Sequence, residues 1–356
     1  NCRILKKLAT TAFTAFLFFP CRAETQKKDF SLIGGIKVPP SPYANEMIQK
    51  YIDMYTKPFG RQQLFDILDD GELYRLYVRQ ELKKRGMPKA LEYLPVVESD
   101  YNPIAVSRSG AKGLWQFMDN SIAPFLKKTE FVDERYDAWK STDAALTKLQ
   151  DNYRQFGDWS IAIAAYNCGA GAMKRILKQA KTKTFWYIAE HGLLRDQSVQ
   201  YVPKLLAICH LAENPDEYDF VLPEITKSNR YAEFDFITTK EQISLARLAS
   251  EMRMEDKILL TLNAALLKKC TPPSSIYNLR LPSGMKESAE IAINSIKGKT
   301  SEKNTLQERN IMHTVRQGET LWSIARKYGV SVEKIRQKNG LTENSVLSIG
   351  KILYIP

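Results

Sequence analysis

Apolar residues recur at helical spacing over residues 61–212, and this pattern limits the fold more than any other feature of the chain. Leu64 and Leu68 fall on one helical face, as do Leu91 and Leu94, because residues three or four apart share a face of an α-helix. Glycines separate the periodic stretches, which is typical of helix ends. The pattern predicts a mainly α globular domain, with later helices at 143–153, 159–166, 170–180 and 201–213.

The segment before this domain is rich in glycine and proline. Gly34 and Gly35 are followed by Pro39, Pro40, Pro42 and Pro58, residues that interrupt regular structure. We therefore predict an extended arm over residues 24–60 and, with a lead-in helix, an N-terminal segment at 24–74 before a domain at 75–213.

The first residues are typical of a secretory signal. Arg3, Lys6 and Lys7 precede an apolar stretch of 12 residues at 8–19, and Cys21-Arg22-Ala23 offers a small-residue cleavage site. The stretch is short for a membrane span. We predict a signal peptide at 1–23 and a protein secreted across the inner membrane to the periplasm or cell envelope. An uncleaved anchor and a lipidated Cys21 remain alternatives.

Charge indicates the kind of partner. The net charge of +12 over 356 residues favours an acidic partner, such as an anionic cell-wall polymer or a lipid surface. The basic residues are scattered rather than clustered, which argues against nucleic acid. Peripheral membrane association is therefore an option, and the oligomeric state stays open.

Cysteine and histidine are too sparse for a metal site. Outside the signal segment the chain has Cys168, Cys209 and Cys270, no CxxC motif, and three widely spaced histidines. We expect no metal and no cofactor. One disulfide between two of the three cysteines is possible, and the sequence does not indicate which.

Two small modules are predicted after residue 230. Residues 284–311 are polar and read as a linker, and residues 312–356 alternate strand, helix, helix and strand, at 313–315, 320–328, 332–339 and 352–355. An internal repeat links this module to residues 231–283: Asn263 matches Asn339 at an offset of 76, and Leu281 matches Ile355 at an offset of 74. We predict that 231–283 is a degenerate copy, because Gln242 replaces Gly318 there.

Glu98 is the candidate catalytic residue. It follows the apolar run from Leu94 to Val97, and a carboxyl at an apolar helix end tends to be desolvated. Desolvation raises the pKa of a carboxylic acid toward the range in which it donates protons near neutral pH, as cleavage of a glycosidic bond requires.

A partner carboxylate is not evident in the sequence. Asp100 is too near in sequence to lie across a sugar, and neither Asp119 nor Asp143 has a local signature. A mechanism with Glu98 as acid and then base therefore has to be considered, with a substrate hydroxyl as nucleophile. Ser107, Gln116 and Asn167 can hydrogen bond sugars, and Trp115 and Tyr166 can stack on them, although core packing is the alternative for Trp115 and Phe117 and turn formation for Ser107.

Four motifs resemble the soluble lytic transglycosylase family in order and spacing. They are Glu98-Ser99, Gly110 to Met118, Ala164 to Gly171, and Gln200 to Pro203. The resemblance implies a lysozyme-like α fold and cleavage of the β-1,4 bond between N-acetylmuramic acid and N-acetylglucosamine, leaving a 1,6-anhydro end. It implies Glu98 as acid and base, with substrate-binding residues at Ser107, Gln116, Met118, Tyr166, Asn167, Gln197 and Tyr201.

Gln197 departs from the family pattern, which usually has a glutamate four residues before the tyrosine. The C-terminal module resembles a LysM domain, from His313 through Ala325 to Ile355-Pro356. LysM domains bind N-acetylglucosamine-containing glycans, and the resemblance implies groove residues at Gly318, Glu319, Thr320, Leu321, Asn339, Gly340 and Leu341.

We therefore predict a lysozyme-like α domain followed by small α/β modules of the LysM kind. The predicted function is a peptidoglycan lytic transglycosylase acting on glycan strands. Two alternatives remain: a muramidase that uses water, and a cell-wall binding protein without activity, for which Gln197 is the only support.

Overall fold

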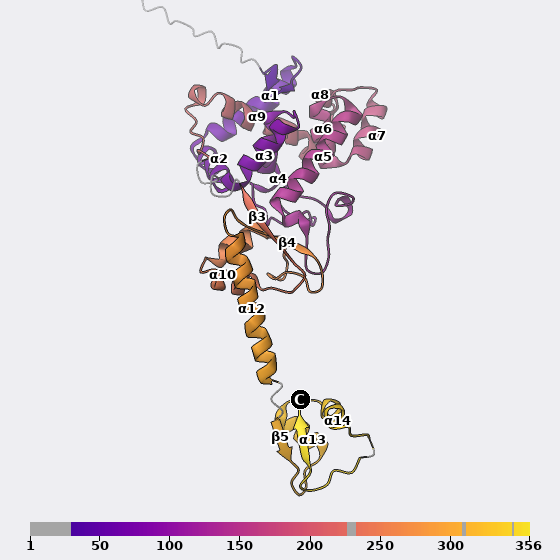
Figure 1. Ribbon diagram of the computed structural model, residues 1–356. Helices are drawn as coiled ribbons and strands as arrows, with labels where there is room; N and C mark the ends of the chain where they lie inside the picture. Colours follow the sequence, from indigo (N-terminus) through magenta and orange to yellow (C-terminus); the bar gives the residue numbers. More distant parts are fainter. Residues whose placement is uncertain (1–29, 226–232, 308–310, 344) are drawn as a thin grey trace, which may run out of the picture.

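The computed structural model describes residues 30–225, 233–307, 311–343 and 345–356. The predicted signal peptide at 1–23 lies outside the described residues. The described part contains a helical body at 30–225, a middle module at 233–298 and a C-terminal module at 311–356 (Figure 1). No helix in these stretches combines the length and apolarity that a membrane crossing needs.

The predicted extended arm at 24–60 is wrong where the structure describes it. A short hairpin of β1 (Leu32–Ile33) and β2 (Ile36–Lys37) leads into α1 (Pro42–Thr56) and α2 (Pro58–Asp70). Pro42 and Pro58 each occupy the first turn of a helix, where the missing N–H costs nothing and the fixed φ fits. The prolines therefore begin helices here instead of preventing them.

The rest of the body confirms the mainly α prediction. The later helices at 143–153, 159–166, 170–180 and 201–213 are all present, some of them longer than predicted. The elements are α3 (Glu72–Lys84), η1 (Lys89–Tyr93), α4 (Leu94–Ser99), η2 (Asp119–Ser121), η3 (Glu134–Tyr136), α5 (Ala138–Phe156), α6 (Trp159–Cys168), α7 (Ala170–Ala180), α8 (Phe185–Glu190), α9 (Asp196–Glu213) and η4 (Asp216–Tyr218).

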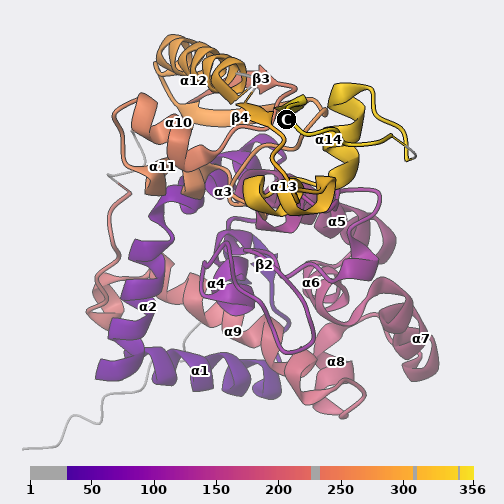
Figure 2. The same ribbon diagram turned by 90° about the horizontal axis from the view of Figure 1, so that it is seen from below.

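The short helix α4 lies among the longer helices α1, α2, α6 and α9 (Figure 2). Its residues Leu94, Pro95 and Val96 are buried in the main hydrophobic core or beside it. The helix ends because Asp100 and Tyr101 adopt left-handed φ values of 51° and 58°. The buried Tyr101 fixes this turn, with its amide donating to the Pro95 carbonyl at 3.1 Å.

The middle module repeats the strand–helix–helix–strand order. It contains β3 (Phe234–Thr239), α10 (Leu245–Glu251), α11 (Asp256–Leu262) and β4 (Tyr277–Pro282), with β3 and β4 paired antiparallel. The predicted linker at 284–311 is instead largely helix, as α12 (Lys286–Gln307). Its first turns bury Ala289, Ile293 and Ile296 against the module, so apolar spacing outweighed the polar composition.

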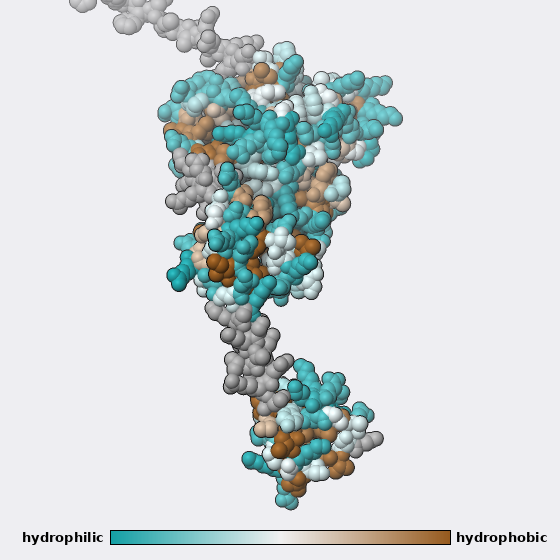
Figure 3. Space-filling model, viewed as in Figure 1, coloured by the Kyte–Doolittle hydropathy of each residue, from teal (hydrophilic) through white to brown (hydrophobic). Residues whose placement is uncertain are grey.

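The C-terminal module has the predicted element order. It contains β5 (Ile311–Thr314), α13 (Leu321–Tyr328), α14 (Val332–Asn339) and β6 (Ile352–Ile355). Its small core, which includes Ile324, Ile335 and Leu353, is separate from the other two clusters. Apolar side chains also gather on its surface in the view of Figure 3.

Candidate active site

Glu98 occupies the last turn of α4, beside the loop that carries the second motif. The next residue, Ser99, ties the helix to this loop, because its hydroxyl donates to the Leu114 carbonyl at 2.8 Å. The left-handed turn at Asp100 then leads the chain away. Glu98 is thus held at a fixed point between the core and the loop.

Burial raises the pKa of Glu98 to about 7, from an ordinary value of 4.5. Two neighbours oppose this shift: the Tyr201 hydroxyl donates a short hydrogen bond to Glu98 Oε1, and the cation of Lys148 stabilises the carboxylate. Desolvation outweighs both, so the acid holds its proton near neutral pH. Such a group can act as a general acid and, once ionised, as a base.

Lys148 approaches the site from α5. Its ammonium lies 4.8 Å from the centre of the Tyr166 ring, within the range of a cation–π contact. Burial lowers the pKa of Lys148, and the charge of Glu98 acts in the opposite direction. The sequence did not indicate this residue, because no motif marks position 148 and only the packing of α5 against α6 brings it to Glu98.

Tyr166 and Asn167 lie at the end of α6, each with a fixed orientation. The Tyr166 hydroxyl donates to the Trp115 carbonyl at 2.9 Å, and Asn167 Oδ1 accepts a hydrogen bond from the Ser198 hydroxyl at 2.8 Å. Ser198, in the first turns of α9, was also missed by sequence reasoning. A serine has no signal of its own until α9 is known to begin as early as Asp196.

The loop beside Glu98 positions Ser107, Gln116 and Met118. The hydroxyl of Ser107 accepts a hydrogen bond from the Ala111 backbone amide at 3.0 Å and so closes a turn. These contacts agree with the turn-forming alternative for Ser107. Gln116 has a left-handed φ of 49°, and its side-chain amide donates to the Gly113 carbonyl at 2.8 Å. Met118 is 38% exposed and is open to a ligand.

The aromatic residues of this loop are part of the core. Trp115 is fully buried, and its indole N–H donates to the Thr142 hydroxyl at 2.8 Å. The suggestion that Trp115 stacks on sugars is therefore wrong, since no face of the ring is open. Phe117 is also buried and packs edge-on against Tyr166, which is itself 7% exposed.

Two of the three other carboxylates considered pair with basic side chains, and the third is exposed. Asp119 pairs with Lys128 at 2.8 Å, and Asp143 accepts from Arg85 at 2.9 Å. Asp100 is exposed beyond the end of α4. Among the described residues, no carboxylate contributes to the pKa of Glu98. The site thus offers one acid, in apolar surroundings, with a hydroxyl and a cation beside it.

Gln197 and Tyr201 belong to α9 but differ in their placement. Tyr201 is 4% exposed and touches Glu98 directly. Gln197 is exposed in the first turn of α9, and no hydrogen bond of its side chain is found in the described part of the chain. The structure therefore brings Tyr201 to Glu98 and leaves the departure at Gln197 on the surface.

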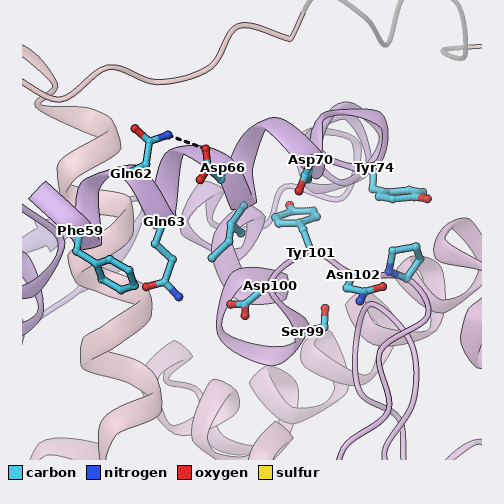
Figure 4. A pocket seen from close by; sticks show the side chains of 12 residues that line it. Phe59, Gln62, Gln63, Asp66, Asp70, Tyr74, Ser99, Asp100, Tyr101 and Asn102 are labelled. Atoms are coloured by element: carbon cyan, nitrogen blue, oxygen red, sulfur yellow. Dashed lines mark hydrogen bonds between the residues drawn. The ribbon is translucent and has the colours of Figure 1, made fainter.

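A pocket of about 740 Å³ adjoins the turn that follows Glu98. Figure 4 shows its wall of polar and aromatic side chains, with α2 on one side and the turn at Ser99 and Asp100 on the other. Its polar lining consists mainly of Gln62, Gln63, Asp66, Asp70, Asp100 and Asn102.

Several predicted glycan-binding residues of the C-terminal module hold its own fold. Asn339 links α14 to β6, because its side-chain amide both donates to and accepts from the backbone of Tyr354 in hydrogen bonds of 2.7 Å. Glu319 accepts from His313 at 2.7 Å, and Thr320 caps α13. Gly318, Leu321, Gly340 and Leu341 lie around these positions. Trp322 was missed, although it is 64% exposed directly beside them.

The described part of the chain contains no group of side chains suited to bind a metal ion. No three histidine, cysteine or carboxylate side chains gather there in a way that would hold an ion. Cys168, Cys209 and Cys270 are unpaired, so the disulfide that the sequence left open is not formed.

Three family models match the chain. The transglycosylase SLT domain matches residues 76–189, the LysM domain matches 313–356, and the LysM-like domain of lytic transglycosylase MltD matches 233–298. The predicted degenerate copy at 231–283 thus overlaps a recognised LysM-like domain over residues 233–283. The limits of the predicted domains remain predictions.

Similar proteins agree with these matches. Membrane-bound lytic murein transglycosylase D of Escherichia coli K12 is 31% identical over 329 residues, covering 89% of this chain and 70% of the relative. A putative tributyltin chloride resistance protein of an Alteromonas strain is 39% identical over 116 residues, covering 32% and 56%. The human LysM and putative peptidoglycan-binding domain-containing protein 2 is 47% identical over 49 residues, covering 14% and 23%.

Proposed function

The chain belongs to the lytic murein transglycosylase D family and is a lyase acting on peptidoglycan, and we propose that Glu98 alone serves it as acid and base. The observation that carries this proposal is the environment of Glu98. Burial raises its pKa to about 7, and the other groups that act on this pKa are the Tyr201 hydroxyl and the Lys148 cation, with no carboxylate among them. A glycoside hydrolase ordinarily uses a second carboxylate, either as the base that activates water or as the nucleophile.

In the first step Glu98 donates its proton to the glycosidic oxygen between N-acetylmuramic acid and N-acetylglucosamine. The bond from C1 of the muramic residue to that oxygen breaks. In the second step the ionised Glu98 takes the proton of the muramic C6 hydroxyl, whose oxygen bonds to C1. The products are a free 4-hydroxyl and a 1,6-anhydro end, and no water is consumed.

Tyr201 and Lys148 support the second step. Both favour the ionised form of Glu98, one by a hydrogen bond and the other by its charge. We assign Asn167, held by Ser198, and the exposed side chain of Met118 to contacts with the sugar. We assign Ser107 and Gln116 to the shape of the groove, because their hydrogen bonds stay within the loop.

The C-terminal module would hold the chain on its polymeric substrate. Its match to the LysM family supports glycan binding. We place the contact near Gly318–Leu321 and Asn339–Leu341 and add Trp322, because an exposed indole beside these loops offers a flat face for a sugar ring. The family and the predicted signal peptide support a place in the periplasm or cell envelope, and the name of the Escherichia coli relative supports membrane association there.

A substitution at Glu98 tests the assignment. Glu98→Gln keeps the size of the side chain and removes the acid, so lysis of purified sacculi is expected to fall by about 10²–10⁴-fold while binding to them persists. Equal lysis by the wild type and the variant would contradict the role of Glu98. If neither is active and both bind, the chain is a wall-binding protein.

A further inference from the structure

The middle module is joined to the helical body along the loop before α5. Val132 of this loop pairs with Leu266 in an antiparallel bridge. The Asp133 amide donates to the Ala265 carbonyl, and the Leu267 amide donates to the Phe131 carbonyl, both at 2.9 Å. Val132 is buried in the hydrophobic cluster of the module, not in that of the body. The loop of the body thus completes the core of the module.

Arg280 of β4 fixes the same joint at a second point. Its guanidinium donates to Asp137 Oδ2 at 3.2 Å and lies 4.2 Å from the centre of the Trp139 ring. Arg280 and Asp137 are 7% and 6% exposed, so the charges are shielded from water. Asp137 also caps α5, the helix that carries Lys148. A buried pair of this kind is costly to separate, because either partner alone is an uncompensated charge.

The internal repeat shows what these positions do in the other copy. The side chain of Asn263 links α11 to β4 through hydrogen bonds of 2.8 and 2.9 Å with the backbone of Arg280. Asn339 bonds the backbone of Tyr354 in the same way. Arg280 therefore corresponds to Tyr354, which is 43% exposed.

By the offset of 76, the docking residues Ala265 and Leu266 correspond to Leu341 and Thr342. These lie in or directly beside the loop that the LysM resemblance assigns to glycan binding. In the middle module that loop is covered by the helical body and is not available to a glycan.

A chain of contacts leads from the joint to the loop beside Glu98. The Asp133 carboxylate accepts from Arg135 at 2.6 and 2.9 Å, and both side chains are at most 2% exposed. The Arg135 guanidinium donates to the Phe117 carbonyl at 3.5 Å. The Arg135 carbonyl lies so close to Gly113 that a Cβ there would clash with it, and Gly113 accepts the hydrogen bond of Gln116.

We propose that the middle module is a support for the catalytic groove and not a second glycan-binding domain. Arg280, Asp133 and Arg135 are positioning residues: they hold the loop from Lys112 to Met118 in the geometry that meets the substrate at Glu98. The inference takes the role of the groove from the proposed function, but the position of the loop can be measured without it.

Arg280→Met in the full chain tests the support, since methionine keeps much of the length and removes the charge. The first readout is hydrogen exchange at the Phe117 and Lys112 amides, which bond each other's carbonyls at 3.1 Å. The second is kcat and KM on a soluble peptide-free glycan of alternating N-acetylglucosamine and N-acetylmuramic acid. The matched control is Glu241→Gln, which breaks the half-exposed Lys297–Glu241 ion pair of the same module.

We expect Arg280→Met to speed exchange at both amides and to lower kcat/KM by about tenfold or more, since misplacement by 1 Å can cost on the order of a hundredfold. The pH at which activity declines should not move, because Tyr201 and Lys148 still flank Glu98. Glu241→Gln should match the wild type in every readout. A folded Arg280→Met variant with wild-type exchange and kcat/KM would overturn the proposal.

Val132→Ala is the milder second variant, for use if Arg280→Met does not fold. It removes two methyl groups from the joint and leaves all charges in place, and we expect the same changes at smaller size. Unchanged exchange in a folded Val132→Ala variant would equally overturn the support. If the wild type cleaves no glycan, the proposed function fails. Hydrogen exchange at the Phe117 and Lys112 amides still decides whether the middle module holds the loop.

Discussion

At the scale of single residues, we expect the proton on Glu98 to set the pH dependence of activity. Burial raises the pKa of this acid to about 7, so the protonated form that starts the reaction declines as the pH rises through 7. We expect kcat/KM on a soluble glycan to fall above that pH. A basic limb that begins near pH 9, or none, would contradict Glu98 as the acid.

The same shift predicts an effect on stability. A raised pKa means that Glu98 favours the folded state most below its unfolded value of 4.5, and that this contribution is lost as the pH rises through about 7. Glu98→Gln should therefore gain stability over the wild type at pH 8 relative to pH 5, by up to about 3 kcal/mol. Urea unfolding at the two pH values measures the difference, and no pH dependence would contradict the raised pKa.

The hydrogen bond from Tyr201 changes the pKa of Glu98. Because the bond lowers the pKa of Glu98, Tyr201→Phe should raise that pKa and move the decline of activity to higher pH. Tyr166→Phe is the control, since its hydroxyl bonds the Trp115 carbonyl and not Glu98. It should leave the pH profile in place and cost about 1 kcal/mol of stability. An identical shift in both variants would argue against a specific role for Tyr201.

The site residues that belong to a sequence motif were predicted, but those that reach the site only through the packing of helices were not. Glu98 was found from the apolar run before it, and Tyr201 from its resemblance to the family. Lys148 and Ser198 have no local signature and reach the site only through α5 and α9. Trp115 was ambiguous, because an aromatic residue in a loop motif is compatible with stacking and with core packing, and only its burial decides.

At the scale of elements, the loop beside Glu98 depends on one close backbone contact. Gly113 and Gly110 both have positive φ, at 81° and 86°, but only Gly113 faces an obstacle, the Arg135 carbonyl. Gly110→Ala should cost about 1–2 kcal/mol from backbone strain alone. Gly113→Ala should cost at least about 2 kcal/mol more, because the loop and Arg135 must separate.

Chemical denaturation of the two variants, with lysis assays, checks this prediction. Gly113→Ala is expected to lose lytic activity as well as stability, and Gly110→Ala to keep most of its activity. Equal losses of stability in the two variants would mean that the contact with Arg135 does not hold the loop.

Helices were predicted well where apolar spacing was long and regular, and poorly where composition gave a conflicting signal. Residues 170–180 form α7 as predicted. Proline at 42 and 58 suggested an arm but lies at helix starts, where it is favoured. The polar stretch after residue 284 suggested a linker, yet a few well-spaced apolar residues made it the helix α12.

At the scale of the whole molecule, the proposed catalytic site and the proposed glycan-binding surface of the C-terminal module belong to parts with separate hydrophobic cores. The C-terminal module has its own hydrophobic cluster, so its surface can change without effect on Glu98. Trp322→Ala should weaken binding to sacculi by about threefold to tenfold, the value of one aromatic contact. Cleavage of a short soluble glycan should be unchanged.

Met312→Ala is the matched control for this prediction, because Met312 and Trp322 are each 64% exposed. Sedimentation of the protein with sacculi measures the binding. If the two variants bind alike, Trp322 is not part of the glycan site.

The fate of water during cleavage tests the single-acid mechanism most directly. If the muramic C6 hydroxyl is the nucleophile, digestion of sacculi in ¹⁸O-labelled water should give fragments with 1,6-anhydro ends and no label at the cleaved bond. Mass spectrometry of the released fragments reads both features at once. Fragments with reducing ends that carry one ¹⁸O atom each would contradict the mechanism and identify the enzyme as a hydrolase.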